Sequence, residues 1–82
     1  MRKHDVAFEL AEQVWDDPAY IIVFDRYEER EERWHAIGLV RGILILTVVH
    51  MHPKIGDEDS IRIISARKAT AHERKRYEAQ ND

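Results

Sequence analysis

Apolar positions near the start of the chain follow a helical period. From Val6 to Trp15 they recur at i, i+4 and i+8 in two adjacent rows, and Asp5 is placed to cap the first turn. The sequence Asp16-Asp17-Pro18 follows directly and disfavours further helix. The pattern predicts a helix over residues 6–15.

Four runs rich in β-branched or aromatic residues predict strands. The third run, Ile-Leu-Ile-Leu-Thr-Val-Val, is unbroken and is typical of a strand buried on both faces, which needs apolar cover on each side from helices or from another chain. An acidic hairpin connection at 27–32, the turn Arg41-Gly42 and a polar loop at 52–59 separate the runs. The predicted strands are Tyr20 to Phe24, Arg33 to Val40, Ile43 to His50 and Ser60 to Ala66.

A final helix is marked by Thr70 and Glu73, which have capping-box spacing, and it should span residues 71–79. The order is helix, four strands in a meander, helix, without an internal repeat or a linker. We therefore predict a single domain over residues 1–82 of the α+β class, a four-stranded antiparallel sheet with an N-terminal and a C-terminal helix.

Composition narrows the class of protein. The chain has 82 residues, 44% hydrophobic and 35% charged, which is typical of a small globular domain. It has no cysteine, so its core, a partner chain or both must stabilise it, and we expect a homo-oligomer or a hetero-oligomer. The longest uncharged apolar stretch, Gly42 to Met51, is about half the roughly 20 residues of a membrane span, and no signal-peptide pattern opens the chain. We expect a cytoplasmic protein with no membrane partner.

Charge is distributed unevenly along the chain. From Asp5 to Glu32 ten acids face two bases, a net charge of −8, whereas from Ile61 to Tyr77 six bases face one acid, a net charge of +5. The basic end can contact phosphates while the acidic part limits non-specific nucleic-acid binding; the alternative is two solvated faces of opposite charge. The predicted RNA-binding residues are Arg62, Lys68, Arg74 and Lys75.

Arg67 is the strongest candidate for chemistry because it ends a predicted strand just before a helix start. An arginine fork and the amides of a helix N-terminus both bind phosphate; the alternative is a pair with the acidic first half. Arg33 and His35 lie two apart on one strand, so they share a face and could lie across the sheet from His50. The alternative for His35 is a half-buried strand histidine.

Two further groups allow more than one interpretation. Tyr77 follows Arg74 by three positions on the final helix, where it could stack on a base, donate a proton or simply anchor the helix. His50 and His52 could bind a metal with Asp57 or Asp59, but two surface histidines are the more ordinary interpretation. No phosphate-binding glycine motif occurs, and we predict neither a metal nor a cofactor.

Several motifs together resemble the BrnT family of type II toxins. They include Lys3-His4, Trp15-x-Asp17-Pro18 and Glu32-Arg33-Trp34, and above all the block Arg62-Ile-Ile-Ser-Ala-Arg67 followed by Glu73-Arg74-x-x-Tyr77. The resemblance implies a RelE-like fold, RNA cleavage that inhibits translation, and neutralisation by a BrnA antitoxin with a ribbon-helix-helix DNA-binding domain.

Three features depart from the family's usual pattern. Family members usually carry a further strand and helix before the Lys-His pair, so either the true start lies upstream of Met1 or those elements are absent. The glycine that commonly follows this pair is Asp5, and the Thr-x-Arg common after the central strand is replaced by Met51-His52-Pro53-Lys54. The resemblance therefore implies a RelE-like sheet that could lack the first strand and helix.

These observations support two hypotheses. The first is a metal-independent ribonuclease in which the ribose 2′-hydroxyl attacks the adjacent phosphorus, a reaction that needs a base, an acid and cations on the phosphate. Arg67 and Arg33 would stabilise the phosphate, His50 or His4 would be the base, and Tyr77 or a second histidine the acid. The alternative is a truncated, non-catalytic toxin fold that binds an antitoxin or itself.

Overall fold

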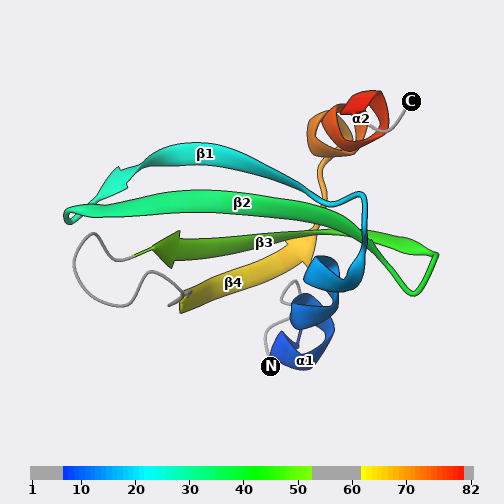
Figure 1. The fold of residues 1–82 in the computed structure, drawn as a ribbon, viewed down its shortest axis with the longest axis horizontal. Helices are drawn as coiled ribbons and strands as arrows, with labels where there is room; N and C mark the ends of the chain where they lie inside the picture. Colours follow the sequence, from blue (N-terminus) through cyan, green and yellow to red (C-terminus); the bar gives the residue numbers. More distant parts are fainter. Residues whose placement is uncertain (1–6, 53–61, 81–82) are drawn as a thin grey trace.

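The fold is a four-stranded antiparallel sheet with strand order β1-β2-β3-β4 and a helical element at each end of the chain (Figure 1). The computed structural model describes residues 7–52 and 62–80. The α+β class predicted from the sequence is confirmed. The elements are α1 (Phe8–Ala11), the 3₁₀ helix η1 (Glu12–Asp16), β1 (Ile21–Glu28), β2 (Glu31–Val40), β3 (Leu44–His52), β4 (Arg62–Lys68) and α2 (Ala71–Gln80).

The N-terminal helix is shorter than the periodicity predicts. Only four residues are α-helical, and the chain then tightens into η1. Ala7 occupies the N-cap position without a side-chain hydrogen bond, and Asp5 lies outside the described residues. The buried positions Ala11 and Val14 are three apart, which is the repeat of a 3₁₀ helix, so the tighter helix still buries both side chains.

The acidic stretch after the first strand is more regular than predicted. β1 continues to Glu28 and β2 begins at Glu31, and the intervening Glu29 and Arg30 have φ of 49° and 69°, so the connection is a two-residue turn with positive φ at both positions. Cations from other strands pair with the acids: Arg62 contacts Glu31 at 2.9 Å. Pairing with these bases explains how such an acidic segment forms strand ends.

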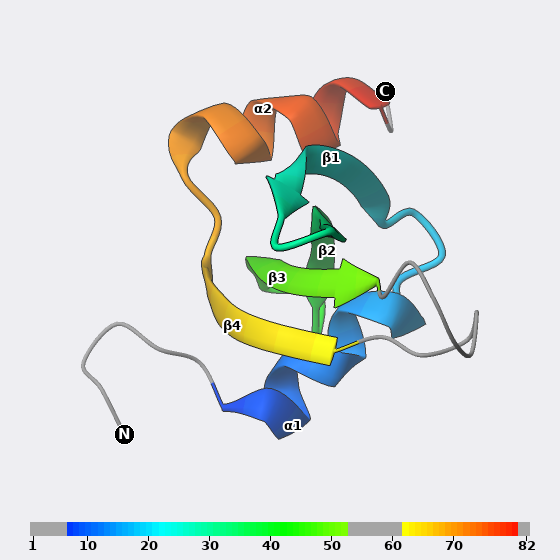
Figure 2. The same ribbon diagram turned by 90° about the vertical axis from the view of Figure 1, so that its left-hand side faces the viewer.

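The two helical regions lie on opposite faces of the sheet (Figure 2). On one face, α1 and η1 cover a core cluster whose residues come from α1, η1, β2, β3 and β4. β3 is buried along its length from Leu46 to Met51, as its unbroken apolar run predicts. The cluster consists of Ala11, Val14, Ala36, Val40, Leu46, Val48 and Ala66.

Gly38 permits the close approach of η1 to β2. A Cβ atom there would lie 2.9 Å from Val14 Cγ1 and 3.0 Å from the Val14 carbonyl oxygen, so any larger residue would push the helix away.

Among the described residues, no helix has the length and apolar character needed to cross a bilayer.

Candidate functional site

Arg67 and Glu73 form a two-point ion pair on the face of the sheet that α2 covers. Arg67 Nη1 lies 2.6 Å from Glu73 Oε1, and Nη2 lies 2.9 Å from Oε2. Glu73 also closes the predicted capping box: the Thr70 N–H donates to its Oε1 at 2.9 Å, and its own N–H donates to Thr70 Oγ1 at 3.1 Å. The start of α2 and the end of β4 are therefore fixed to each other through one carboxylate.

The same carboxylate reaches two further strands. Thr47, whose neighbours in the sheet are Ile37 on β2 and Arg67 on β4, donates its hydroxyl to Glu73 Oε1 at 2.9 Å. His35 on β2 places Nδ1 3.8 Å from Glu73 Oε2. Glu73 is thus the centre of contacts from three strands and one helix.

On its other side His35 faces acids and bases of β1 and β2. Its Nε2 lies 3.6 Å from Asp25 Oδ2, and the same oxygen lies 3.2 Å from Arg33 Nε. Arg33 Nη1 also pairs with Glu28 at 3.0 Å. Two arginines, two carboxylates and the imidazole between those carboxylates line up across the sheet in what we call the charged row: Arg67, Glu73, His35, Asp25 and Arg33.

The protonation states in the charged row follow from this geometry. Burial would raise the pKa of Glu73, but hydrogen bonds from Arg67, the Thr70 N–H and Thr47 outweigh it and lower the pKa to about 2. The hydrogen bond to Glu73 raises the pKa of Arg67. Burial lowers the pKa of His35 below its ordinary value, because it outweighs the opposing effect of Asp25 and Glu73. The imidazole is therefore neutral at pH 7, between permanently charged groups.

This arrangement combines phosphate-binding groups with a proton acceptor. The Arg67 side chain is 38% exposed, and the side chains of Arg33 and His35 retain 23% and 21% exposure. A guanidinium with donors directed at solvent can bind phosphate, and a neutral imidazole can accept a proton. The charged row therefore carries the two kinds of group that phosphoryl chemistry requires.

His50 lies on the opposite face of the sheet from Arg67. Side chains alternate along β3, so Thr47 faces α2 and His50 faces η1, where its fully buried ring lies 5.3 Å from the ring of Trp15. The expectation that His35 would lie across from His50 is wrong: His35 pairs with Val49, and Trp34 pairs with His50. The structure therefore does not bring His50 together with Arg67 and Arg33.

Tyr77 anchors α2 to the segment between η1 and β1. Its side chain is buried, and its hydroxyl donates to Asp17 Oδ2 at 2.6 Å. Asp17 also accepts the N–H groups of Leu39 at 2.8 Å and Ala19 at 2.9 Å. Burial and the hydrogen bond to Asp17 raise the pKa of Tyr77 to about 12. This environment matches the helix-anchor interpretation of Tyr77.

The remaining predicted residues lie at the surface or outside the described part of the chain. His4 lies outside it, as do Lys54 and the acids Asp57 and Asp59 of the possible metal set. In residues 7–52 and 62–80, no three histidine or acidic side chains are arranged to hold a metal ion. The predicted RNA-binding residues are all exposed: Arg62, which pairs with Glu31, and Lys68, Arg74 and Lys75.

Sequence reasoning missed three members of the site. The sequence marks Glu73 as a helix cap and as part of a family motif but not as a partner of Arg67, and it does not single out Asp25 or Thr47. The sequence does contain a signal for the pairing of Glu73 with Arg67. Glu73 lies six positions after Arg67, and the short connection between strand and helix brings the Glu73 side chain back to the end of the strand. Asp25 and Thr47 are placed by strand register, which the sequence does not reveal.

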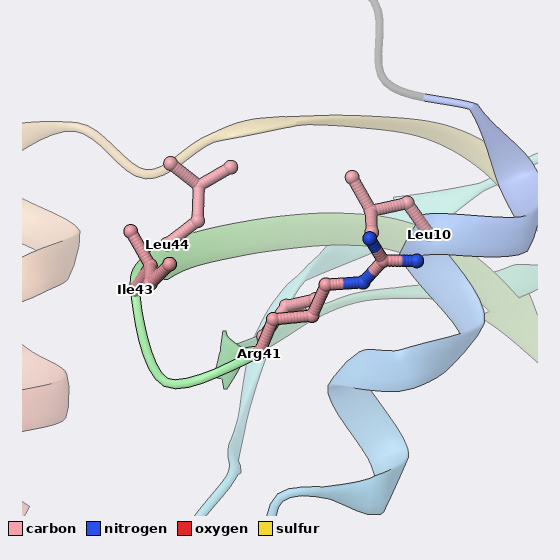
Figure 3. A pocket seen from close by; sticks show the side chains of 5 residues that line it. Leu10, Arg41, Ile43 and Leu44 are labelled. Atoms are coloured by element: carbon pink, nitrogen blue, oxygen red, sulfur yellow. The ribbon is translucent and has the colours of Figure 1, made fainter.

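An apolar pocket of about 190 Å³ lies where the β2–β3 turn approaches α1 (Figure 3). Among the described lining residues, Arg41 alone is charged, and its Nε donates to Gln13 Oε1 at 3.4 Å. The described residues that line it include no acid, histidine or hydroxyl group, so we place no reaction there. It is lined by Leu10, Val40, Arg41, Ile43 and Leu44.

Comparison with known proteins identifies the family. A family model described as the ribonuclease toxin BrnT of a type II toxin-antitoxin system matches residues 1–73. No curated protein matches the chain. The matched segment contains all five members of the charged row and the Arg-Ile-Ile-Ser-Ala-Arg block, and a type II system implies an antitoxin partner. The chain belongs to the BrnT family of ribonuclease toxins.

Proposed function

We propose that this chain is an endoribonuclease that cuts RNA through attack of a ribose 2′-hydroxyl on the adjacent phosphorus. The observation that supports this proposal is the position of His35, between the carboxylates of Asp25 and Glu73, with Arg67 and Arg33 at the two ends of the charged row. RNA cleavage of this kind requires a proton acceptor and cations on the same phosphate, without a bound metal.

In this mechanism His35 accepts the proton of the 2′-hydroxyl. The 2′-oxygen then bonds to phosphorus, the bond from phosphorus to the 5′-oxygen breaks, and Arg67 and Arg33 stabilise the negative charge that develops on the phosphate oxygens. The leaving 5′-oxygen takes a proton from an acid, and we propose His4, predicted from the sequence as a possible base, for that role. Tyr77 is a poor acid, because its hydroxyl is bound to Asp17 and its pKa is raised.

The exposed bases around the charged row would hold the RNA backbone. Lys68 follows Arg67 directly, and Arg74 and Lys75 lie on the first turns of α2. We propose that RNA binds across this basic surface in the cytoplasm, that its cleavage inhibits translation, and that a BrnA-like ribbon-helix-helix antitoxin covers the surface with an acidic or apolar segment. Association with such an antitoxin should slow as salt rises.

The chemistry of the cleaved ends tests the proposal. Purified protein incubated with single-stranded RNA should leave 2′,3′-cyclic phosphate and 5′-hydroxyl ends, and excess EDTA should not change the rate. Mass spectrometry of the fragments identifies the ends. Fragments with 5′-phosphate ends, or cleavage abolished by EDTA, would contradict the mechanism.

A second candidate is the non-catalytic binding module. The edge strand β1 favours it, because Ile22 and Phe24 expose about two-fifths of their surface and Tyr27 more than half, a display typical of an interaction surface. Induced expression separates the two candidates. If the protein is a ribonuclease, its expression arrests growth and the Arg67→Ala variant does not. If it is a binding module, the wild type and the Arg67→Ala variant affect growth equally.

A further inference from the structure

We propose that Glu73 is a positioning residue of this site, whose carboxylate holds Arg67 in one orientation and keeps a negative charge beside His35. The inference rests on the proposed ribonuclease function and deepens it. It goes beyond the capping role that the spacing of Thr70 and Glu73 predicts, because two of the groups that contact this carboxylate are the proposed catalytic residues.

The first argument is how fully the carboxylate of Glu73 is engaged. The side chain is only 12% exposed, and its two oxygens accept four hydrogen bonds: two from Arg67, one from Thr47 and one from the Thr70 N–H. A carboxylate has about four lone-pair positions. Glu73 therefore cannot rotate without breaking bonds to β3, β4 and the start of α2 at the same time.

The second argument concerns Arg67. In the part of the chain that the structure describes, every hydrogen bond recorded for its guanidinium goes to Glu73. A bidentate pair fixes the plane of the guanidinium as well as its position, and it leaves the other donors of the fork for a phosphate. Without Glu73, the long side chain would sample many rotamers and rarely present those donors correctly.

The third argument concerns His35, which faces charged groups from every element around it. Asp25 of β1 and Glu73 of α2 favour the protonated imidazole, whereas Arg67 of β4 and Arg33 of β2 oppose it. Glu73 Oε2 lies 3.8 Å from Nδ1. Loss of this one negative charge leaves two arginines opposed by Asp25 alone, so the pKa of His35 must fall further.

The variant that tests the inference is Glu73→Gln, which keeps the size and one acceptor oxygen but removes the charge. We expect kcat to fall roughly tenfold or more with little change in KM, because orientation rather than RNA affinity is lost. We expect the pKa of His35, followed by NMR titration, to fall by about one unit. The matched control is Glu78→Gln, an exposed acid on the same helix, which should leave both quantities unchanged.

A second variant separates positioning from helix capping. Thr70→Ala removes the hydroxyl that accepts the Glu73 N–H but keeps the charge beside His35, so it should lower the melting temperature without moving the pKa of His35. A His35 pKa that is the same in Glu73→Gln as in the wild type would overturn the inference. So would an equal fall of kcat in Thr70→Ala and Glu73→Gln.

The titration does not depend on activity. If the wild-type protein cuts no RNA, the proposed function fails by that result. A His35 pKa that still fell in Glu73→Gln would support the electrostatic half of the inference, and an unchanged pKa would overturn it.

Discussion

Arg67 is partly exposed and at the same time fixed, a combination unusual for a surface arginine. Its side chain is 38% exposed, yet two of its nitrogens are bound to Glu73, whose side chain is largely buried. Ordinary surface ion pairs contribute little to stability because two long side chains must be immobilised to form them. Here the carboxylate is already fixed by its other bonds, so holding Arg67 costs less conformational entropy. That makes the guanidinium suitable for binding a transient charge.

We predict that Arg67→Ala lowers the rate of RNA cleavage by roughly 100 to 1000-fold, the effect of deleting one preorganised donor. The melting temperature should also fall by a few degrees, because Glu73 loses its main partner. Initial rates and thermal melts measure the two effects. The control is Arg76→Ala, an exposed arginine on α2 outside the charged row, which should change neither. Wild-type cleavage by Arg67→Ala would remove this residue from the site.

At the residue scale the sequence predicts relations within one strand better than the face that a fully apolar strand turns to each helix. The position of Arg67 before a helix start is visible in the sequence, and so is the shared face of Arg33 and His35. The face of His50 is not, because its strand is apolar at almost every position and gives no alternation to set the phase. The partner of Arg67 is local, Glu73, rather than the acidic first half of the chain.

At the scale of elements, α2 is the part of the fold that completes the site. Its capping box predicts its start, and the structure confirms a helix over Ala71–Gln80. Its first turn supplies Glu73 to the charged row, and its second turn supplies Tyr77 to Asp17. The N-terminal helix is predicted less well, since apolar spacing alone does not distinguish one α-helix from a short α-helical turn that tightens into η1.

We predict that Tyr77→Phe destabilises the protein without reducing cleavage by the folded fraction. The change removes the hydroxyl that donates to Asp17, which remains charged and part-buried with only backbone N–H groups of Leu39 and Ala19 among its described donors. The free energy of unfolding should fall by about 1–3 kcal/mol. Urea unfolding measures the stability, and rates are compared under conditions in which both proteins are folded. A large loss of cleavage at unchanged stability would instead identify Tyr77 as the acid.

At the scale of the whole molecule, the surface is divided in charge and in polarity. β1 and β4 are the two edges of the sheet, and the β1 edge is flanked by acids whereas β4 and α2 are basic. Tyr20, Ile22 and Phe24 expose apolar surface along the β1 edge, where no further strand covers it within the described residues. Unprotected sheet edges promote association.

We predict that the purified chain associates with itself or with a partner protein rather than staying monomeric. A small domain without cysteines gains stability from burying the apolar side chains of β1. Light scattering at micromolar concentration should give a mass above the 9.8 kDa of one chain. A single species of 9.8 kDa that unfolds cooperatively on heating would contradict this prediction.

The hydrogen bond between Tyr77 and Asp17 has a consequence for the order of folding. It joins residues 60 positions apart, and Asp17 also binds Leu39, so its carboxylate is in place only after β2 has paired. Contacts between residues so distant in sequence form late, because closing the long loop between them costs conformational entropy. We therefore expect α2 to dock through Tyr77 late in folding, after the local pairing of Arg67 with Glu73, which lie six positions apart. A nascent chain would then lack the contact that fixes α2 against the sheet until synthesis has passed Tyr77, so the helix beside the charged row would be the last element to take its place.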